Sequence, residues 1–155
     1  MSSTIDARIA ELGLVLPQAA APVAAYVPAV EIGGLLYISG QLPFDDGALM
    51  TGRLGEDRDV DFGTHAAQRC ALMLVAQMKA ALGSLDRVER IVKLGAFVSS
   101  TPGFTAQPQV ANGASEVMVA IFGEAGKHAR SAVGVPVLPL HAAVEVDAIV
   151  AVRPA

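Results

Sequence analysis

The stretch "HARSAVGVPVLPLHAAVEVDAI", residues 128–149, contains two apolar runs that we expect to form the last two strands of the fold. In the second run, apolar residues alternate with Glu145 and Asp147, so one face of that strand carries two carboxylates and the other carries only valine and alanine. We expect the apolar face to pack on helices and the acidic face to meet water or another subunit. The short connection "PLHA" predicts that the two runs, 130–138 and 143–152, pair with each other as a hairpin.

Patterns upstream of this stretch predict a second hairpin and two long helices. The runs "YVPAVEI" and "LLYISGQL" flank Gly33 and Gly34, a typical hairpin turn. Apolar residues recur at helical spacing over residues 64–82 and 108–123. The remaining expected elements are a short amphipathic helix over residues 3–12, a strand over residues 90–100, and a loop with at most one short strand over residues 43–63.

The order of these elements is ββαβαββ, which predicts the fold class α+β. We expect a mainly antiparallel sheet, formed from hairpins at both ends, with two helices packed on one face. At 155 residues the chain is long enough for one hydrophobic core and short for two. We therefore expect a single domain over residues 1–155, with a helix and an extended link in residues 1–20 and the sheet domain in residues 21–155.

The composition is unusually apolar for a protein without a membrane span. Hydrophobic residues make up 53% of the chain and charged residues 17%, yet no apolar run approaches the roughly 18 to 20 residues that a span needs. We expect no membrane association, and we expect part of the apolar surface to be buried between subunits. The first residues lack the pattern of a signal peptide, and a single cysteine fits a reducing compartment, so we expect a cytoplasmic protein.

Charge and motif content argue against several classes of function. The net charge is −4, and the 11 Lys and Arg residues are scattered, so nucleic acid is not an expected partner. His65, His128 and His141 have no Cys or carboxylate partner at a ligand spacing, so no metal site is expected. The glycines near the first hairpin match no nucleotide-binding fingerprint. Cys70 falls on the apolar side of a predicted helix and is expected to be a packed thiol.

Arg130 is a charged residue that opens an apolar strand, and it has two possible explanations. A salt bridge with Glu145, Asp147 or Glu124 is the more common one on spacing alone. The other is bidentate capture of a ligand carboxylate or phosphate. In a simple hairpin of the last two strands, Arg130 and Glu145 would be roughly six residues apart along the strands, at about 3.3 Å per residue. If these two charges share a site, a second subunit or another element must bring them together.

Two blocks of the sequence resemble the RidA/YjgF family of reactive-intermediate deaminases, also labelled endoribonuclease L-PSP. One is "YVPAVEIGGLLYISGQLP", with Ser39-Gly40-Gln41 after a hydrophobic strand. The other is Ala129-Arg130-Ser131, followed at fixed distance by Leu138-Pro139 and Val144-Glu145. The resemblance extends over roughly residues 20–153. It implies a chorismate-mutase-like ββαβαββ fold that assembles as a homotrimer with clefts between subunits.

The resemblance also implies an activity: hydrolysis of enamine or imine intermediates to 2-keto acids and ammonia, with no cofactor or metal. The expected partner is then a small imine or keto acid that carries a carboxylate. By position, the family's site residues match the carboxylate anchor Arg130, the glutamate Glu145 that orients or activates water, and the substrate-binding residues Tyr26, Ser39 and Gly40. Asn112 is the candidate for the family's helix asparagine, in a segment where this chain is longer than the family pattern.

Three positions depart from the family pattern and leave alternatives open. Ala132 stands where the family has a cysteine, Gly134 where it has a small acidic or polar residue, and His128 where a proline is usual. We expect these changes to enlarge or reshape the cleft. One alternative is a non-catalytic trimeric module that binds small carboxylate metabolites in the same cleft. Another, an endoribonuclease, follows only from the family label, and the acidic charge argues against it.

Overall fold

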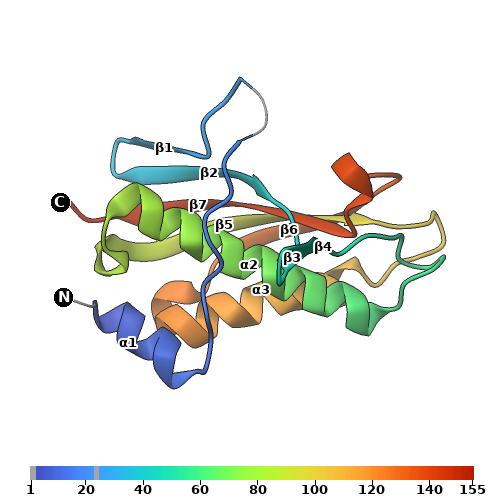
Figure 1. Ribbon diagram of the computed structural model, residues 1–155, viewed down its shortest axis with the longest axis horizontal. Coiled ribbons are helices and arrows are strands. Elements are labelled where there is room, and N and C mark those ends of the chain that lie inside the picture. Colours follow the sequence, from blue (N-terminus) through green and yellow to red (C-terminus); the bar gives the residue numbers. More distant parts are fainter. Residues whose placement is uncertain (1–2, 23–24) are drawn as a thin grey trace.

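The computed structural model, which describes residues 3–22 and 25–155, is a five-stranded sheet with two long helices on one face (Figure 1). The sheet order is β1-β2-β7-β5-β6, and β3 and β4 form a separate two-stranded ribbon. The helices are α1 (Thr4–Glu11), α2 (Val60–Leu82) and α3 (Gln107–Phe122). The strands are β1 (Ala29–Ile32), β2 (Leu35–Gln41), β3 (Phe44–Asp45), β4 (Ala48–Leu49), β5 (Val88–Ser99), β6 (Ala129–Val135) and β7 (Val144–Val152). The α+β class predicted from the sequence is confirmed.

Local signals explain where the helices begin and how closely they pack. The start of α2 lies four residues before the predicted one, because the Asp59 carboxylate accepts a hydrogen bond from the backbone N–H of Phe62 (2.9 Å) and caps the helix. Gly113 in α3 costs the helix about 1 kcal/mol relative to alanine. A Cβ atom at Gly113 would collide with the backbone oxygen of Thr64, so this glycine lets α2 and α3 approach each other closely.

The first predicted hairpin is confirmed, and the last one is wrong. Strands β1 and β2 pair through the turn at Gly33 and Gly34, both at positive φ. Strand β7, in contrast, lies between β2 and β5 and is antiparallel to both, whereas β6 is an edge strand parallel to β5. The connection 136–143 contains two prolines, which interrupt a ladder, and it carries the chain past β5. Helix α3 supplies the crossover that a parallel β5-β6 pair requires.

The two faces of β7 differ as the alternation predicted. Its valines and Ala148 are buried under the helices, while Glu145 and Asp147 are only partly buried on the opposite face. Most of the buried apolar residues of the described chain form one cluster, which includes Ile9 of α1 and Val152 of β7. Of the helices in residues 3–22 and 25–155, none combines the length and hydropathy of a membrane span.

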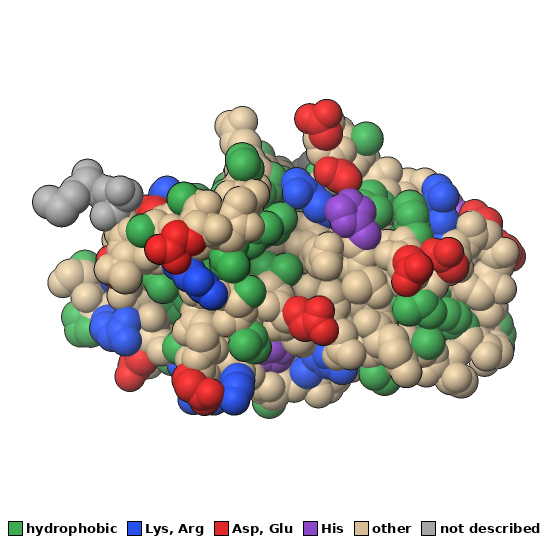
Figure 2. Space-filling model, turned by 90° about the horizontal axis from the view of Figure 1, so that it is seen from below, with side chains coloured by type: hydrophobic (Ala, Val, Ile, Leu, Met, Phe, Trp, Pro, Cys, Tyr) green, Lys and Arg blue, Asp and Glu red, His purple; other side chains and the backbone are tan. Residues whose placement is uncertain are grey.

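The face of the sheet opposite the helices carries exposed apolar side chains. Register places Val30, Ile32, Tyr37 and Val133 on this face, and their exposed fractions are 49%, 65%, 44% and 44%. On the side of α1 and α3, in contrast, acidic and basic side chains are interspersed (Figure 2). An apolar face of this kind is typical of a surface that is covered in an assembly.

Candidate functional site

Arg130 is held by neutral oxygen atoms on the helix side of the edge strand β6. Its Nη1 donates to the Asn112 Oδ1 (2.9 Å) and to the Ser115 Oγ (3.1 Å), and its Nη2 donates to the Pro108 carbonyl oxygen (3.4 Å). No carboxylate among the described residues pairs with this guanidinium, and Glu124 is paired with Lys127 instead. The salt bridge favoured on spacing is therefore wrong, and the positive charge of Arg130 has only neutral partners in the described chain.

Ser115 and His128 belong to the same hydrogen-bond chain; sequence reasoning missed Ser115 and named His128 only as a departure from the family pattern. The His128 Nδ1 lies 2.6 Å from the Gly126 carbonyl oxygen, which can only accept. This assigns the Nδ1–H tautomer to the neutral ring, so the His128 Nε2 accepts from the Ser115 hydroxyl (2.8 Å). Ser115 follows Asn112 by three residues, so the two share a face of α3, and that spacing could have indicated a common partner.

Glu145 lies on the opposite face of the sheet, beside a bulge in β2. Ile38 pairs with Ala148 and Gln41 with Val146, so Ser39 and Gly40 together stand opposite the single residue Asp147. A Cβ atom at Gly40 would take the space of the Glu145 carboxylate. The glycine of the "SGQ" motif thus leaves the space that the Glu145 carboxylate occupies.

Ser39 fixes the segment that carries Tyr26. Its hydroxyl donates to the Val27 carbonyl oxygen (3.0 Å), and its backbone N–H donates to the Pro28 carbonyl oxygen (2.9 Å). Tyr26, one residue before Val27, is half exposed and lines the same hollow as Gly40. The bulge therefore organises both the carboxylate and the tyrosine segment.

The environment of Glu145 favours its protonated form. Burial raises the pKa of the Glu145 carboxyl, and the nearby charge of Asp147 raises it further. Burial also raises the pKa of Asp147, whose carboxylate fills the space that a side chain at Gly95 would need. A raised pKa makes the carboxylate a stronger base, which suits it to proton transfer.

The sequence-predicted site residues thus form two groups that do not meet within one chain. We call Arg130 and Asn112 the arginine half-site, and Glu145, Ser39, Gly40 and Tyr26 the glutamate half-site. Phe97 of β5 pairs with both Glu145 and Val133, which puts these three on one face. Arg130 is three residues from Val133, so it points to the other face. Arg130 and Glu145 therefore do not meet within the chain, as expected. The cause is this strand register and not the predicted hairpin.

Neighbouring side chains surround two of the positions that depart from the family pattern, Gly134 and Ala132. A Cβ atom at Gly134 would lie 2.6 Å from the Ser100 Oγ and 2.8 Å from the Gln107 Nε2, so these two polar groups already occupy that space. Ala132 is half-buried against the core. A side chain at position 134 would therefore have to displace Gln107, at the start of α3, or Ser100, directly after β5.

Metal and thiol chemistry find little support in the described residues. Within residues 3–22 and 25–155, no three His, Cys, Asp or Glu side chains are grouped to hold a metal ion. Cys70 is fully buried, and burial raises the pKa of its thiol, so the sulfur stays protonated and packed as expected.

Comparison with known proteins identifies the family. The model of the family described as "YjgF/chorismate_mutase-like, putative endoribonuclease" matches residues 6–151. The chain belongs to the RidA/YjgF family. The match includes most of α1, so this RidA/YjgF protein resembles its family over more of its length than the two sequence blocks indicated.

Relatives of this RidA/YjgF protein fall at two levels of similarity. Protein TCP17 of Trypanosoma cruzi is 55% identical over 151 residues, which cover 96% of this chain and 94% of that protein. The crystal structure of Atu1372, of unknown function, from Agrobacterium tumefaciens has a TM-score of 0.90 at 48% identity, covering 96% and 92% of the two chains. The structure of Escherichia coli TdcF with bound serine has a TM-score of 0.60 at 26% identity, covering 88% and 94%. The difference between these TM-scores, 0.90 and 0.60, indicates that this protein belongs to a distinct subgroup of its family.

Proposed function

We propose that this protein hydrolyses 2-imino acids and their enamine tautomers to 2-keto acids and ammonia, in a site completed by two copies of the chain. The observation that carries the proposal is the guanidinium of Arg130, fixed by neutral acceptors and free of a carboxylate among the described residues. Such a group suits the carboxylate of a small ligand. A single cysteine in the chain fits a reducing compartment, and we propose the cytoplasm.

The two half-sites lie on opposite faces of one sheet, so a second copy is needed to join them. Arg130 lies on the edge strand β6 and Glu145 on the central strand β7, with β5 between. The exposed apolar face that includes Val30, Ile32 and Tyr37 supports association of copies through that face. We propose the homotrimer that the family resemblance implies, in which each cleft takes the arginine half-site of one chain and the glutamate half-site of its neighbour.

The proposed reaction is the addition of water to C2 of the imine, followed by loss of ammonia. The water oxygen forms a bond to C2 as one water proton passes to the imine nitrogen, which gives a tetrahedral carbinolamine. The remaining hydroxyl proton then passes to the nitrogen as the C2–N bond breaks and the C2=O double bond forms, so that ammonia leaves. Arg130 holds the substrate carboxylate, which orients C2. Glu145 takes each of these protons from the oxygen and delivers it to the nitrogen, a role that its raised pKa favours.

Two other functions compete with this proposal. A binding module without turnover is favoured by the bound serine in the TdcF structure and by Ala132 at the family's cysteine position. Endoribonuclease activity is named in the family description. The net charge of −4 and the interspersed charges in Figure 2 favour a small ligand over RNA.

The direct test generates imines in place and measures their loss. An amino-acid oxidase with catalase would form 2-imino acids, and semicarbazide would trap those that survive. We expect the protein to lower semicarbazone formation and to speed ammonia release in proportion to its concentration. If no imine disappears faster than in buffer, hydrolysis is contradicted. Saturable binding of 2-keto acids by calorimetry would then favour the binding module.

A further inference from the structure

An apolar pocket adjoins the glutamate half-site. Its volume is about 150 Å³, and Tyr26 and Gly40 form part of its lining. Most of the remaining lining is apolar, from the N-terminal link, the β2-β3 connection, α2 and the β6-β7 connection, and includes Pro22, Phe44, Met73 and Leu140. An apolar cavity of about this volume in another protein admits benzene. The pocket can therefore hold a group the size of an isobutyl or benzyl side chain.

Buried amides fix one wall of this pocket. The Gln77 side chain, 3% exposed, donates to the Ala20 carbonyl oxygen (2.8 Å) and to the Gln41 Oε1 (3.2 Å). Gln41 in turn donates to the Ser39 carbonyl oxygen (2.9 Å). Buried amides are costly to leave unpaired, so this network ties the N-terminal link firmly to the β2 bulge.

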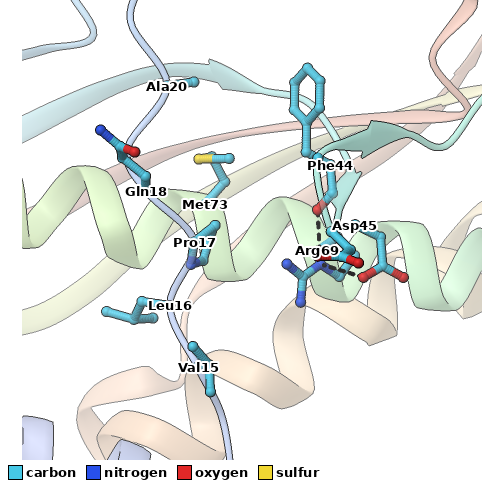
Figure 3. A pocket seen from close by; sticks show the side chains of 11 residues that line it. Val15, Leu16, Pro17, Gln18, Ala20, Phe44, Asp45, Arg69 and Met73 are labelled. Atoms are coloured by element: carbon cyan, nitrogen blue, oxygen red, sulfur yellow. Dashed lines mark hydrogen bonds and ion pairs between the residues drawn. The ribbon is translucent and has the colours of Figure 1, made fainter.

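The neighbouring hollow shows how the link crosses α2. Figure 3 shows residues Val15 to Ala20 running past Met73, with Phe44 on the far side. That hollow is wider, about 580 Å³, and shares Ala20, Phe44 and Met73 with the apolar pocket. The link is therefore the structural element that closes the apolar pocket on one side.

Leu140 forms the opposite rim in a strained conformation. Its φ is 58° and the φ of His141 is 61°, values that residues other than glycine rarely adopt. Backbone hydrogen bonds fix the turn. The N–H of His141 donates to the Leu138 carbonyl oxygen (3.0 Å), and the N–H of Gly52 donates to the His141 carbonyl oxygen (3.1 Å). Leu140 is 71% exposed, so an apolar side chain is held out at the pocket.

We infer that this pocket receives the side chain of the substrate, which makes the preferred substrates the imines of large aliphatic or aromatic amino acids. The inference rests on the proposed function, because it assumes that the substrate's C2 lies beside Glu145. Gly40 borders both the Glu145 carboxylate and the pocket, so a side chain on C2 has a short path into it. A charged side chain would lose its water there without a partner of opposite charge in the lining.

The turnover test compares imines that differ only in side chain. Oxidases would form the imines of leucine, phenylalanine, alanine and glutamate; either enantiomer of an amino acid gives the same imine, since C2 is planar. Each buried methylene is worth roughly fourfold, so we expect kcat/KM for the leucine imine to exceed that for the alanine imine by about 10- to 60-fold. The glutamate imine should be no better than the alanine imine. A leucine-to-alanine ratio near one would overturn the inference and leave the proposed hydrolysis intact.

A binding measurement decides the inference even without turnover. Calorimetry should give a Kd for 4-methyl-2-oxopentanoate at least about tenfold below that for pyruvate. Leu140→Ala should reduce that ratio severalfold, whereas Val137→Ala, in the same connection, exposed and outside the pocket, should leave it unchanged. Equal affinities, or equal effects of the two variants, would show that the pocket does not select the side chain. Absence of turnover with a retained affinity ratio would contradict only the hydrolysis.

Discussion

Arg130→Ala is expected to lower kcat/KM for imine hydrolysis by at least about 30-fold, because it removes the charged anchor for the substrate carboxylate. Arg130→Lys should recover only part of this loss, since an ammonium group cannot form the paired hydrogen bonds of a guanidinium. The loss should fall on KM at least as much as on kcat. Steady-state kinetics on the imine assay measures both.

A matched control separates anchoring from general damage. Arg90 donates to the backbone oxygen of Lys127 (2.8 Å) and belongs to neither half-site, so Arg90→Ala should retain wild-type kinetics. The melting temperature of Arg130→Ala should stay close to that of wild type, since its partners Asn112 and Ser115 can turn to water. Full activity of Arg130→Ala would contradict the assigned anchor.

Glu145→Gln is expected to lower kcat by about 10²- to 10⁴-fold, the usual contribution of a general acid-base group. The amide keeps the shape of the side chain but cannot carry a proton between water and nitrogen. Gly40→Ala should act in the same direction, because the new methyl group would displace the Glu145 carboxylate. Gly103→Ala is the control, since a Cβ at that glycine would meet no atom within 4 Å. An unchanged kcat for Glu145→Gln would exclude this residue as the proton carrier.

The Glu145→Gln variant should also be more stable than wild type at neutral and alkaline pH. The folded-state pKa of Glu145 is raised, so the folded chain holds this proton more tightly than the unfolded chain does. The stability that this provides is fully present below the unfolded pKa, about 4.3, and is lost as the pH rises through the folded pKa. The melting temperature of Glu145→Gln should therefore exceed that of wild type at about pH 8 and converge with it near pH 4. A difference in melting temperature between the variant and wild type that grows toward acid pH would contradict the raised pKa of Glu145.

Local patterns in the sequence predicted most helices and strands, because the spacing of apolar residues reflects which side chains are buried. The alternation around Glu145 and Asp147 identified both faces of β7 correctly. The pairing of β6 was not predictable in this way, since a parallel edge strand and a hairpin strand have the same local pattern. The connection with Pro136 and Pro139 was the signal against a hairpin.

The candidate site was only partly readable from the sequence, for a geometric reason. The family motifs pointed to Arg130 and Glu145, but the contact between Arg130 and Asn112 joins residues 18 apart and depends on how α3 lies on β6. The bulge at Ser39 is likewise a matter of register, which no single strand reveals. Long-range pairing, rather than residue type, was the missing information.

The central claim, that a complete site needs both half-sites from different chains, has one most direct test. Arg130→Ala and Glu145→Gln chains would be co-expressed in equal amounts, and the mixed oligomer would be purified and assayed. With random mixing in a cyclic assembly, about one site in four combines an intact Arg130 with an intact Glu145 of the neighbour, so imine hydrolysis should recover to about a quarter of the wild-type rate. Activity of the mixed oligomer no higher than the mean of the two inactive variants would contradict the shared site.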